Sequence, residues 1–523
     1  MRKAIKKAAA LLLALVLSMG SAACAKEQAP ALSEEAAEVL VYGSGDYTAI
    51  NPALYEHGEI NLLLFAGLMA HNGQNEVVPD VAETWEYDAK NCTYTFKLRR
   101  DVYFHDGHPL TSRDVRFTLQ AIMDPKNASE NASNYEGILE IETPDDYTVI
   151  LFLAAPNVVL LDYLTIGILP AHLLEGKDLA LDSFNQNPVG AGPYRLEQWD
   201  MGQSITLKKH EQYHRGEPKI DEIIFKIVED TQARALQLQS GELDLAQVTP
   251  EDAQMFRQGQ NSQDYRVYQM DTADYRGILY NFNGDFFSRH RELPNILSYA
   301  IDRQAIVDTV LMGCGEAAYS PLQKGPYVNE QMEKFEYNPQ KAMQLLEQAG
   351  WSKGEDGIYQ KEGERLQFCI HNSQGDQVRI DMSNICAQQL GEIGADVCVK
   401  VDAQVDWAGQ DAYLIGWGSP FDPDDHTYKV FGTQKGANYS GYSNEQVDFL
   451  LLSARQTEDR EQRQQLYAQF QQALSEDMPY TFLAYVDAIY VSTPRLKGIA
   501  EDTVLGHHGV GIFWNVAEWE LEQ

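Results

Sequence analysis

From residue 39 onward, short stretches with a strand-like pattern alternate with longer stretches of helical pattern. Residues 93–98 (TYTFKL) alternate polar and apolar side chains, which is typical of a half-buried strand. Residues 39–43 (VLVYG) form an apolar run that ends in a glycine-rich loop at 43–46, and they predict another strand. Further strands are predicted at 147–153, 194–197, 204–208 and 222–228.

Helix signals lie between these strands. Thr111 is expected to cap a helix, because Asp114 stands at the third helical position. Asn338 and Pro339 predict the start of another helix, and Gly350 predicts its end. Further helices are predicted at 231–239, 295–312, 444–455 and 458–475. Because strands and helices are interspersed throughout, the chain is expected to have a mixed α/β fold.

The N-terminal residues have a different pattern. Basic residues among the first seven precede an apolar block at 8–19, which is shorter than the ~20 residues that a membrane-spanning helix needs. This order predicts a secretory signal peptide at 1–23. The ending "SAAC" resembles the lipobox of bacterial lipoproteins, which implies lipidation of Cys24 and a flexible tether at 24–38. An ordinary signal peptide with an incidental cysteine is the alternative.

Length and charge narrow the classes of function. The 523 residues are enough for two or three domains, and the formal net charge is −36. Such a chain repels nucleic acid and anionic lipid, so we expect neither as a partner. Acidity spread along the chain is typical of a solvated surface, and an acidic cleft for cationic ligands is the alternative. If Cys24 carries lipid, five cysteines remain without a CxxC motif, which leaves room for one or two disulfides but predicts no disulfide framework.

Two histidine pairs are the candidates for metal chemistry. His210, Glu211 and His214 spell HExxH, a zinc-peptidase motif that works only on a helix. Here the motif follows a strand-like run and precedes glycine and proline, so we predict a loop and keep a zinc peptidase as a remote alternative. His507 and His508 are adjacent, and adjacent residues share no face of a helix or strand. The sequence therefore predicts no enzyme, no catalytic residue, no metal ligand and no cofactor.

Several blocks of sequence, taken in order, resemble family 5 solute-binding proteins, the peptide/nickel class of ABC importers. The first reads VPDVAETWEYDAKNCTYTFKLRRDVYFHDGHPLTSRDVRFTL. It resembles the family's Pro-[AD]-[LV]-Ala-x-x-Trp entry, its strand, its Val-x-Phe-x-[DN]-Gly motif and the helix that follows. The blocks cover 78–119, 189–199, 213–227, 238–246, 297–315, 337–351 and 442–455.

The resemblance implies a two-lobe periplasmic-binding-protein fold (type II, cluster C) with an extra subdomain inserted in lobe one. In such a fold the lobes close by a hinge on a ligand buried between them. The expected boundaries are 39–270 plus 485–523 for lobe one, about 55–185 for its insert, and 275–482 for lobe two, with crossings near 270–280 and 480–490.

The resemblance also implies a role. We expect a lipid-anchored substrate-binding component of an ABC importer, which captures oligopeptides or dipeptides and delivers them to a membrane permease. It would be monomeric and would stand outside the cell's cytoplasm, on the outer face of the cytoplasmic membrane.

The stretch LIGWGSPFDPDDH bears on the ligand. In peptide-binding members of the family, an aspartate after the tryptophan region holds the peptide's ammonium group. That position falls at Ser419 or Pro420 here, so the aspartate is missing or moved. Asp422 could replace it, with Asp424 or Asp425 next in line, or Asp422 could simply start a turn.

Two other family signatures are incomplete. The arginine that meets the peptide carboxylate in dipeptide binders would fall near Ser373 and Gln374, whereas Arg379 is expected on the following helix. The phrase WGSPFDP also resembles the Trp-Gly-x-Pro-Tyr-Asp-Pro of nickel-chelate binders. Those carry an arginine two residues before the tryptophan, where this chain has Ile415, and a downstream histidine that has no match here.

We therefore predict a peptide-type ligand, with a nickel chelate, metallophore or other small cationic solute as the alternative. The predicted ligand-binding residues are Tyr42, Gly43 and Ser44 on lobe one, Asn281 and Asn283 near the hinge, and Trp417, Asp422, Tyr439 and Tyr442 on lobe two.

Overall fold

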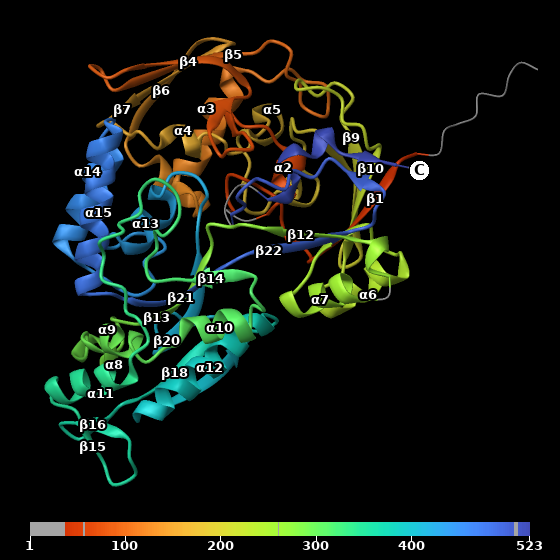
Figure 1. The fold of residues 1–523 in the computed structure, drawn as a ribbon. Helices are drawn as coiled ribbons and strands as arrows, with labels where there is room; N and C mark the ends of the chain where they lie inside the picture. Colours follow the sequence, from red (N-terminus) through yellow and green to blue (C-terminus); the bar gives the residue numbers. More distant parts are fainter. Residues whose placement is uncertain (1–36, 56–57, 260, 507–510, 523) are drawn as a thin grey trace, which may run out of the picture. The chain divides into compact units, whose positions relative to one another are not determined.

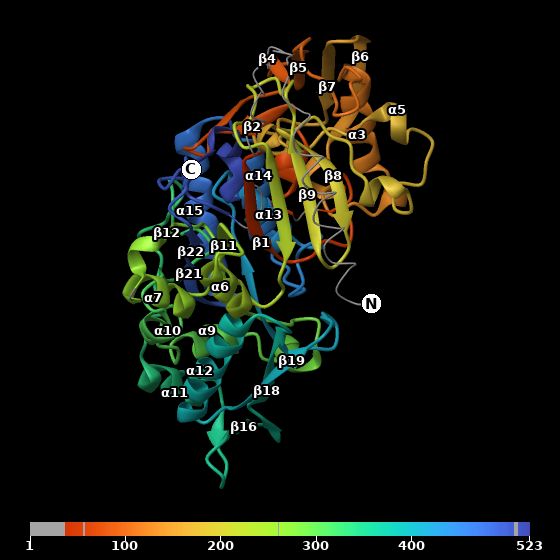
Figure 2. The ribbon, with the colours of Figure 1, turned by 90° about the vertical axis from the view of Figure 1, so that its right-hand side faces the viewer.

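A seven-stranded mixed sheet runs through the first part of the protein in the computed structural model, which describes residues 37–55, 58–259, 261–506 and 511–522. The predicted signal peptide, Cys24 and the pair His507-His508 lie outside the described residues. Strand β1 pairs in parallel with β10 and β11, whereas β22 pairs antiparallel with β11 and β12 (Figures 1 and 2). In sheet order the strands are β12 (Arg266–Met270), β22 (Ala488–Ser492), β11 (Leu245–Gln247), β1 (Val39–Ser44), β10 (Glu222–Ile227), β9 (Ser204–Lys209) and β8 (Tyr194–Asp200).

A four-stranded antiparallel sheet packs into the same hydrophobic core. The predicted capping box of the helix beside it is confirmed: the Thr111 backbone N–H donates to Asp114 Oδ2 at 2.9 Å. The sheet consists of β4 (Ala82–Asp88), β5 (Thr93–Leu98), β7 (Thr148–Leu153) and β6 (Ile138–Asp145). The smaller strands are β2 (Met69–His71), β3 (Val77–Pro79), β23 (Leu496–Lys497) and β24 (Glu520–Leu521). The helices of this part are α2 (Asn61–Leu64), α3 (Ser112–Met123), α4 (Leu160–Tyr163), α5 (Ala171–Leu174), α6 (Thr231–Ser240) and α7 (Pro250–Gln258). We call this part lobe one.

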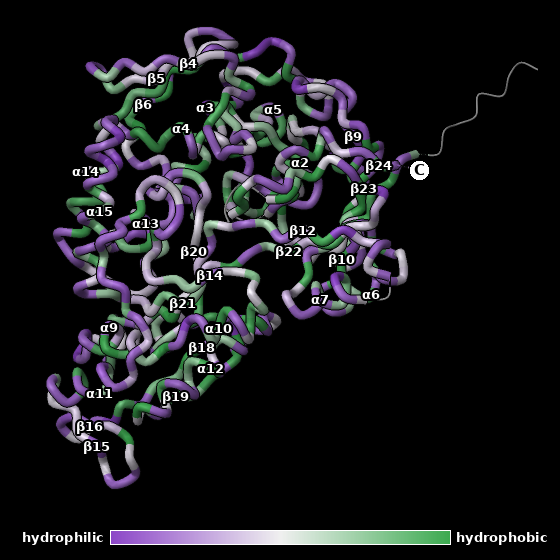
Figure 3. Tube along the Cα trace, viewed as in Figure 1, coloured by the Kyte–Doolittle hydropathy of each residue, from purple (hydrophilic) through white to green (hydrophobic). Residues whose placement is uncertain are grey.

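A second hydrophobic core surrounds a six-stranded sheet, and we call this part lobe two. A disulfide joins Cys369 to Cys398, which are direct partners on β18 and β19. In sheet order the strands are β14 (Gly315–Ala317), β21 (Tyr480–Val486), β13 (Tyr275–Tyr280), β20 (Ala412–Trp417), β18 (Gln367–Ser373) and β19 (Asp396–Asp402). A small sheet contains β15 (Ser352–Lys353), β16 (Tyr359–Lys361) and β17 (Glu364–Arg365). The helices are α8 (Asp285–Arg289), α9 (Leu293–Ser298), α10 (Arg303–Thr309), α11 (Pro339–Gln348), α12 (Gln377–Ile393), α13 (Asp424–Phe431), α14 (Glu445–Gln456) and α15 (Arg460–Glu476). Hydrophilic positions predominate along α15 (Figure 3).

The chain passes between the two sheets twice. It leaves β12 and enters β13 across residues 271–274, and it returns from β21 to β22 at Asp487. These two segments, 271–274 and Asp487, therefore connect the two lobes. None of the helices in the described part of the chain is long and apolar enough to cross a membrane.

Most predicted elements agree with the structure to within a few residues. The helix predicted at 295–312 is wrong, because two short helices, α9 and α10, take its place. Asp302 lies between them, and its carboxylate accepts a hydrogen bond from the Ala305 backbone N–H at 3.0 Å. An aspartate that caps a new helix in this way competes with continuation of the preceding one.

Candidate functional site

A cleft of ≈ 730 Å³ lies between the two cores and is lined from both lobes and from the first crossing segment. This volume falls within the roughly 300–1,000 Å³ that small-molecule sites occupy. Aromatic side chains supply much of its wall: Tyr55, Phe65, Tyr135, Tyr163, Tyr213, Phe421, Tyr490, Phe513 and Trp514. Such rings offer apolar area that can cover a ligand and exclude water.

Arg276 is a cation of the cleft without a close ion-pair partner among the described residues. It stands on β13, and its guanidinium donates a hydrogen bond to the Tyr275 carbonyl oxygen at 3.1 Å. Among the residues that the structure describes, it forms no ion pair. Burial and the nearby charge of Arg379 lower the pKa of Arg276 to about 10, and the charges of Asp274 and Asp376 oppose this fall. The side chain is therefore charged at neutral pH, at a place where an unpaired charge is costly.

A glycine makes room for this guanidinium. Gly416 is the direct partner of Arg276 across β13 and β20. A Cβ atom at position 416 would lie 2.3 Å from Arg276 Nη1, so a side chain there would displace the arginine. The pairing of a glycine with an arginine lets the guanidinium lie against the strand and face the cleft.

Arg379 adds a second positive group to the same cleft. It belongs to the first turn of α12, as the sequence predicts, and its Nε lies 3.0 Å from Asp376 Oδ2. Asp376 also caps the helix by accepting a hydrogen bond from the Arg379 backbone N–H at 3.0 Å. Asp376 thus balances the charge of Arg379, and Arg276 is left as the guanidinium here without an ion pair to the described residues.

The carboxylates on the cleft wall mostly have partners within the protein. Asp162 pairs with His71 at 3.1 Å, and Asp422 accepts from both guanidinium nitrogens of Arg463. Burial raises the pKa of the Asp162 carboxyl, while the hydrogen bond from His71 opposes the rise. The ring of His71 also stacks on that of Phe421, with centroids 3.4 Å apart, so lobe one contacts lobe two here.

Glu59 is a carboxylate of lobe one that faces the cleft. Its Oε1 accepts a hydrogen bond from the Tyr42 hydroxyl at 2.6 Å. Burial raises the pKa of the Glu59 carboxyl, and the Tyr42 hydrogen bond and the charge of Arg234 oppose the rise. A carboxyl in this state favours its neutral form more than an exposed glutamate does.

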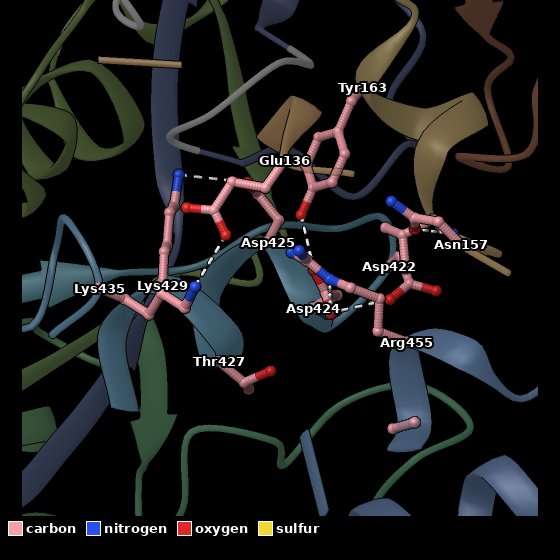
Figure 4. A network of polar contacts seen from close by, with 12 residues as sticks. Glu136, Asn157, Tyr163, Asp422, Asp424, Asp425, Thr427, Lys429, Lys435 and Arg455 are labelled. Atoms are coloured by element: carbon pink, nitrogen blue, oxygen red, sulfur yellow. Dashed lines mark hydrogen bonds and ion pairs between the residues drawn. The ribbon is translucent and has the colours of Figure 1, made fainter. Parts of the chain in front are cut away.

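A buried network next to the cleft joins the lobes, and we call it the interlobe clasp (Figure 4). Asp424 of lobe two, fully buried, accepts from Arg455 Nη2 at 2.6 Å and from the Tyr163 hydroxyl of lobe one at 2.8 Å. The Val158 backbone N–H donates to the Arg455 carbonyl at 3.0 Å. These contacts hold α4 of lobe one against α13 and α14 of lobe two.

The three predicted site residues of lobe one lie in the core beside the cleft. Tyr42 is buried, and its hydroxyl reaches Glu59. Gly43 is packed so closely that an added Cβ would lie 2.7 Å from Leu243 Cδ1. Ser44 is buried, and its hydroxyl donates to the Gly45 carbonyl at 2.9 Å. None of the three is among the residues that line the cleft.

Of the six residues predicted near the hinge and on lobe two, one lines the cleft and five do not. Asp422 lines the cleft, whereas Trp417 and Tyr442 are buried and outside the lining. The Asn281 side-chain amide donates to the carbonyls of Trp407, Ala408 and Gln410, and its oxygen accepts from the Asn283 backbone N–H at 2.9 Å. This pair therefore holds a loop in place. The ring of Tyr439 stacks on Trp407 with centroids 4.1 Å apart. Ligand contact by these nine residues stays a prediction.

The HExxH segment forms turns, as the sequence predicts. His210 Nδ1 lies 3.1 Å from the Gly192 carbonyl oxygen, and His214 Nε2 lies 2.7 Å from Asp80 Oδ1. The two histidines therefore have separate structural partners and share no helical face.

Comparisons with known proteins agree with this architecture. The family model described as "Bacterial extracellular solute-binding proteins, family 5 Middle" matches residues 76–439. The chain belongs to family 5 of the bacterial extracellular solute-binding proteins. The oligopeptide-binding protein AppA of Bacillus subtilis is 30% identical over 511 residues, which cover 92% of this chain and 91% of the relative. The dipeptide-binding protein of Escherichia coli is 26% identical over 545 residues, with 97% and 99% covered.

Solved structures of similar proteins confirm the fold class. NikZ from Campylobacter jejuni, in complex with Ni(L-His), has a TM-score of 0.87 and 33% identity, with 92% of this chain and 99% of that chain covered. Bacillus subtilis AppA, in complex with a nonapeptide, has a TM-score of 0.83 and 29% identity, with 93% and 100% covered. The two-lobe family 5 fold thus matches over nearly the whole described chain.

Sequence reasoning missed Arg276, although a signal was present. The strand Tyr275–Tyr280 reads YRGILY, in which one arginine interrupts an apolar run. An arginine inside a strand of this kind is rarely buried without a partner, so the interruption points to a function. Position 415, where nickel-chelate binders carry an arginine, is Ile415 here, and its neighbour Gly416 lies directly opposite Arg276 on the adjacent strand.

Proposed function

We propose that this protein is the extracytoplasmic solute-binding component of an ABC importer, and that it captures peptides by closing its two lobes. It would be held by lipid on Cys24 at the outer face of the cytoplasmic membrane and would deliver its solute, as a monomer, to a permease. Membership of the solute-binding family and the cleft between two separate cores support this role.

Arg276 is the observation on which the ligand class rests. It forms no ion pair with the residues that the structure describes, although the charges of Asp274 and Asp376 reach it, and a carboxylate of the solute would supply a direct partner. A guanidinium can bind a carboxylate through two parallel hydrogen bonds, which gives both strength and orientation. The carboxyl end of a peptide meets this requirement.

The relatives support a peptide as the first choice. The 30% identical relative is named an oligopeptide-binding protein, and its structure was solved with a nonapeptide. Peptides are held mainly through their main chain, and aromatic walls such as those of this cleft tolerate many side chains.

Nickel with histidine is the second candidate, because NikZ at 33% identity was solved with Ni(L-His). Histidine also carries a carboxylate, so Arg276 fits either solute. The two candidates differ in whether affinity requires the metal.

Native mass spectrometry of the purified, untagged protein would weigh any solute that co-purifies. Calorimetric titration would then use a set of synthetic di- to nonapeptides, and separately nickel with L-histidine, nickel alone and L-histidine alone. We expect saturable binding of peptides by the wild type and loss of most affinity in R276Q. R365Q is the matched control, because Arg365 forms an exposed pair with Asp356 in lobe two.

Binding that needs both nickel and histidine would overturn the peptide proposal in favour of the chelate. If no peptide and no nickel–histidine mixture binds or raises the melting temperature, the solute proposal as a whole fails, because a ligand of the native state must stabilise it.

A further inference from the structure

Three metal-ligating side chains meet on the surface of lobe one, outside the cleft. Asp106 and His108 stand on either side of Gly107, and His172 comes from α5. His172 Nε2 lies 2.6 Å from Asp106 Oδ2, and His108 Nδ1 lies 3.2 Å from Asp106 Oδ1. One ligand atom from each of the three lies within 4.8 Å of the other two.

The backbone under these side chains is fixed from both sides. The Phe104 backbone N–H donates to the His108 carbonyl at 2.8 Å, and the Gly107 N–H donates to the Phe104 carbonyl at 2.8 Å. Gly107 has φ +86°, a conformation that favours glycine and lets the turn present Asp106 and His108 together.

The helix that carries His172 is anchored by Asp114, the third residue of α3 and a member of its capping box. Asp114 Oδ1 accepts a hydrogen bond at 2.9 Å from the backbone N–H of Ala171, which directly precedes His172. Asp114 is itself buried. The ring of His172 stacks on that of His108, with centroids 4.0 Å apart and planes 27° apart. Two rigid segments thus hold the imidazoles close, which lowers the entropy lost when both bind one ion.

We propose that Asp106, His108 and His172 form a surface site for a divalent transition-metal ion of the zinc or nickel type. Two imidazoles and one carboxylate are the donor set that such borderline ions prefer. Each imidazole would bind the metal through the ring nitrogen that now faces Asp106, and its proton would stand on the other ring nitrogen.

Solvent access completes the site. The side chains of His108, Asp106 and His172 are 59%, 26% and 23% exposed. Three protein ligands leave at least one coordination position, which water can fill. The acidic chain, with a net charge of −36, also raises the local concentration of cations.

The site is independent of the proposed solute cleft. None of its three residues is among those that line the cleft. Metal and solute should therefore bind the same molecule without competition, and each can be tested in the absence of the other.

Calorimetric titration of the untagged full chain with Zn²⁺ alone, and separately with Ni²⁺ alone, tests the proposal without histidine or peptide in the buffer. We expect one equivalent of metal per chain in the wild type. H108Q should weaken binding at least tenfold, since even partners of metal ligands contribute about 10–100-fold. His108 is mostly exposed, so H108Q should keep the wild-type melting temperature.

Three controls make the result specific. H371Q removes the histidine of a single His–Asp pair in lobe two, whose atoms lie 2.6 Å apart, and should leave metal affinity unchanged. H507Q/H508Q, at the adjacent pair in the sequence, should also leave it unchanged. R276Q should bind metal as the wild type does, which separates this site from the cleft. Diffraction at the zinc absorption edge would locate the ion.

Absence of saturable binding by the wild type would overturn the proposal, as would equal affinity in H108Q. Metal binding that is lost in H507Q/H508Q or in R276Q but kept in H108Q would also overturn it, because the ion would then bind at another site.

Discussion

The interlobe clasp permits a prediction with a calculable size. Arg455→Met removes the guanidinium but retains most of the apolar stem. Within the described part of the chain, the Asp424 carboxylate, whose side chain is 0% exposed, would then keep only the hydrogen bond from the Tyr163 hydroxyl. A buried carboxylate cannot recover its lost hydration in this position, so the cost falls on the folded state.

The expected loss follows from the geometry of the pair. Arg455 donates to both oxygens of Asp424, at 2.6 and 3.1 Å, and lies 3.6 Å from the centre of the Tyr428 ring. Removal of one partner from a buried ion pair typically costs about 3–5 kcal/mol. The cation–π contact, worth up to about 2 kcal/mol when desolvated, forms part of that total. R455M should therefore lower the free energy of unfolding by about 3–5 kcal/mol.

Urea unfolding at neutral pH, followed by tryptophan fluorescence and by far-ultraviolet circular dichroism, measures this loss. R365M is the matched control, because Arg365 and Asp356 are 42% and 51% exposed and their pair is worth at most about 1 kcal/mol. D424N/R455M should regain part of the stability, since it removes the stranded charge as well. R365M should have a free energy of unfolding within about 1 kcal/mol of that of wild type. If R455M does as well, the Asp424 carboxylate has found another partner and the reasoning is refuted.

Three further predictions concern the cleft. Tyr163→Phe removes a hydrogen bond to a charged group and should lower the unfolding free energy by about 1.5–3 kcal/mol; an unchanged urea midpoint would contradict this. Arg276→Gln should weaken binding of a carboxylate-bearing solute about tenfold or more by calorimetry, with R365Q unchanged. Glu59→Gln should raise the melting temperature relative to wild type by an amount that grows as the pH rises above the ordinary glutamate pKa. The raised pKa means that the wild type loses stability as this carboxyl ionises, so a difference that does not change with pH would count against it.

Local signals account for the elements that the sequence predicts correctly. The alternation in 93–98 and the capping box of Thr111 and Asp114 act within a few residues, and both appear as expected. The break at Asp302 was also encoded locally, by an aspartate whose carboxylate caps α10.

The candidate site was less predictable, because its decisive pairs are distant in sequence. Tyr163 and Asp424 are 261 residues apart, and Arg276 meets Gly416 only through the pairing of two strands. Family resemblance directed attention to 414–426, yet of that stretch's candidate acids Asp422 is held by Arg463 and Asp424 by Arg455. A carboxylate that a motif singles out can thus serve the packing of its own lobe.

The acidity of the whole chain gives little information about the charge of the ligand. Exposed charges are screened within about 10 Å at 0.1 M salt, so most of the −36 does not reach a solute inside the cleft. Groups in the cleft act at short range and with weaker screening. There the carboxylates of Asp162 and Asp422 are paired with His71 and with Arg463, whereas Arg276 forms no ion pair among the described residues and is influenced by Asp274 and Asp376 only through their charge. An acidic protein can therefore present a site for an anionic group, because the unpaired charge nearest the solute decides which group is bound.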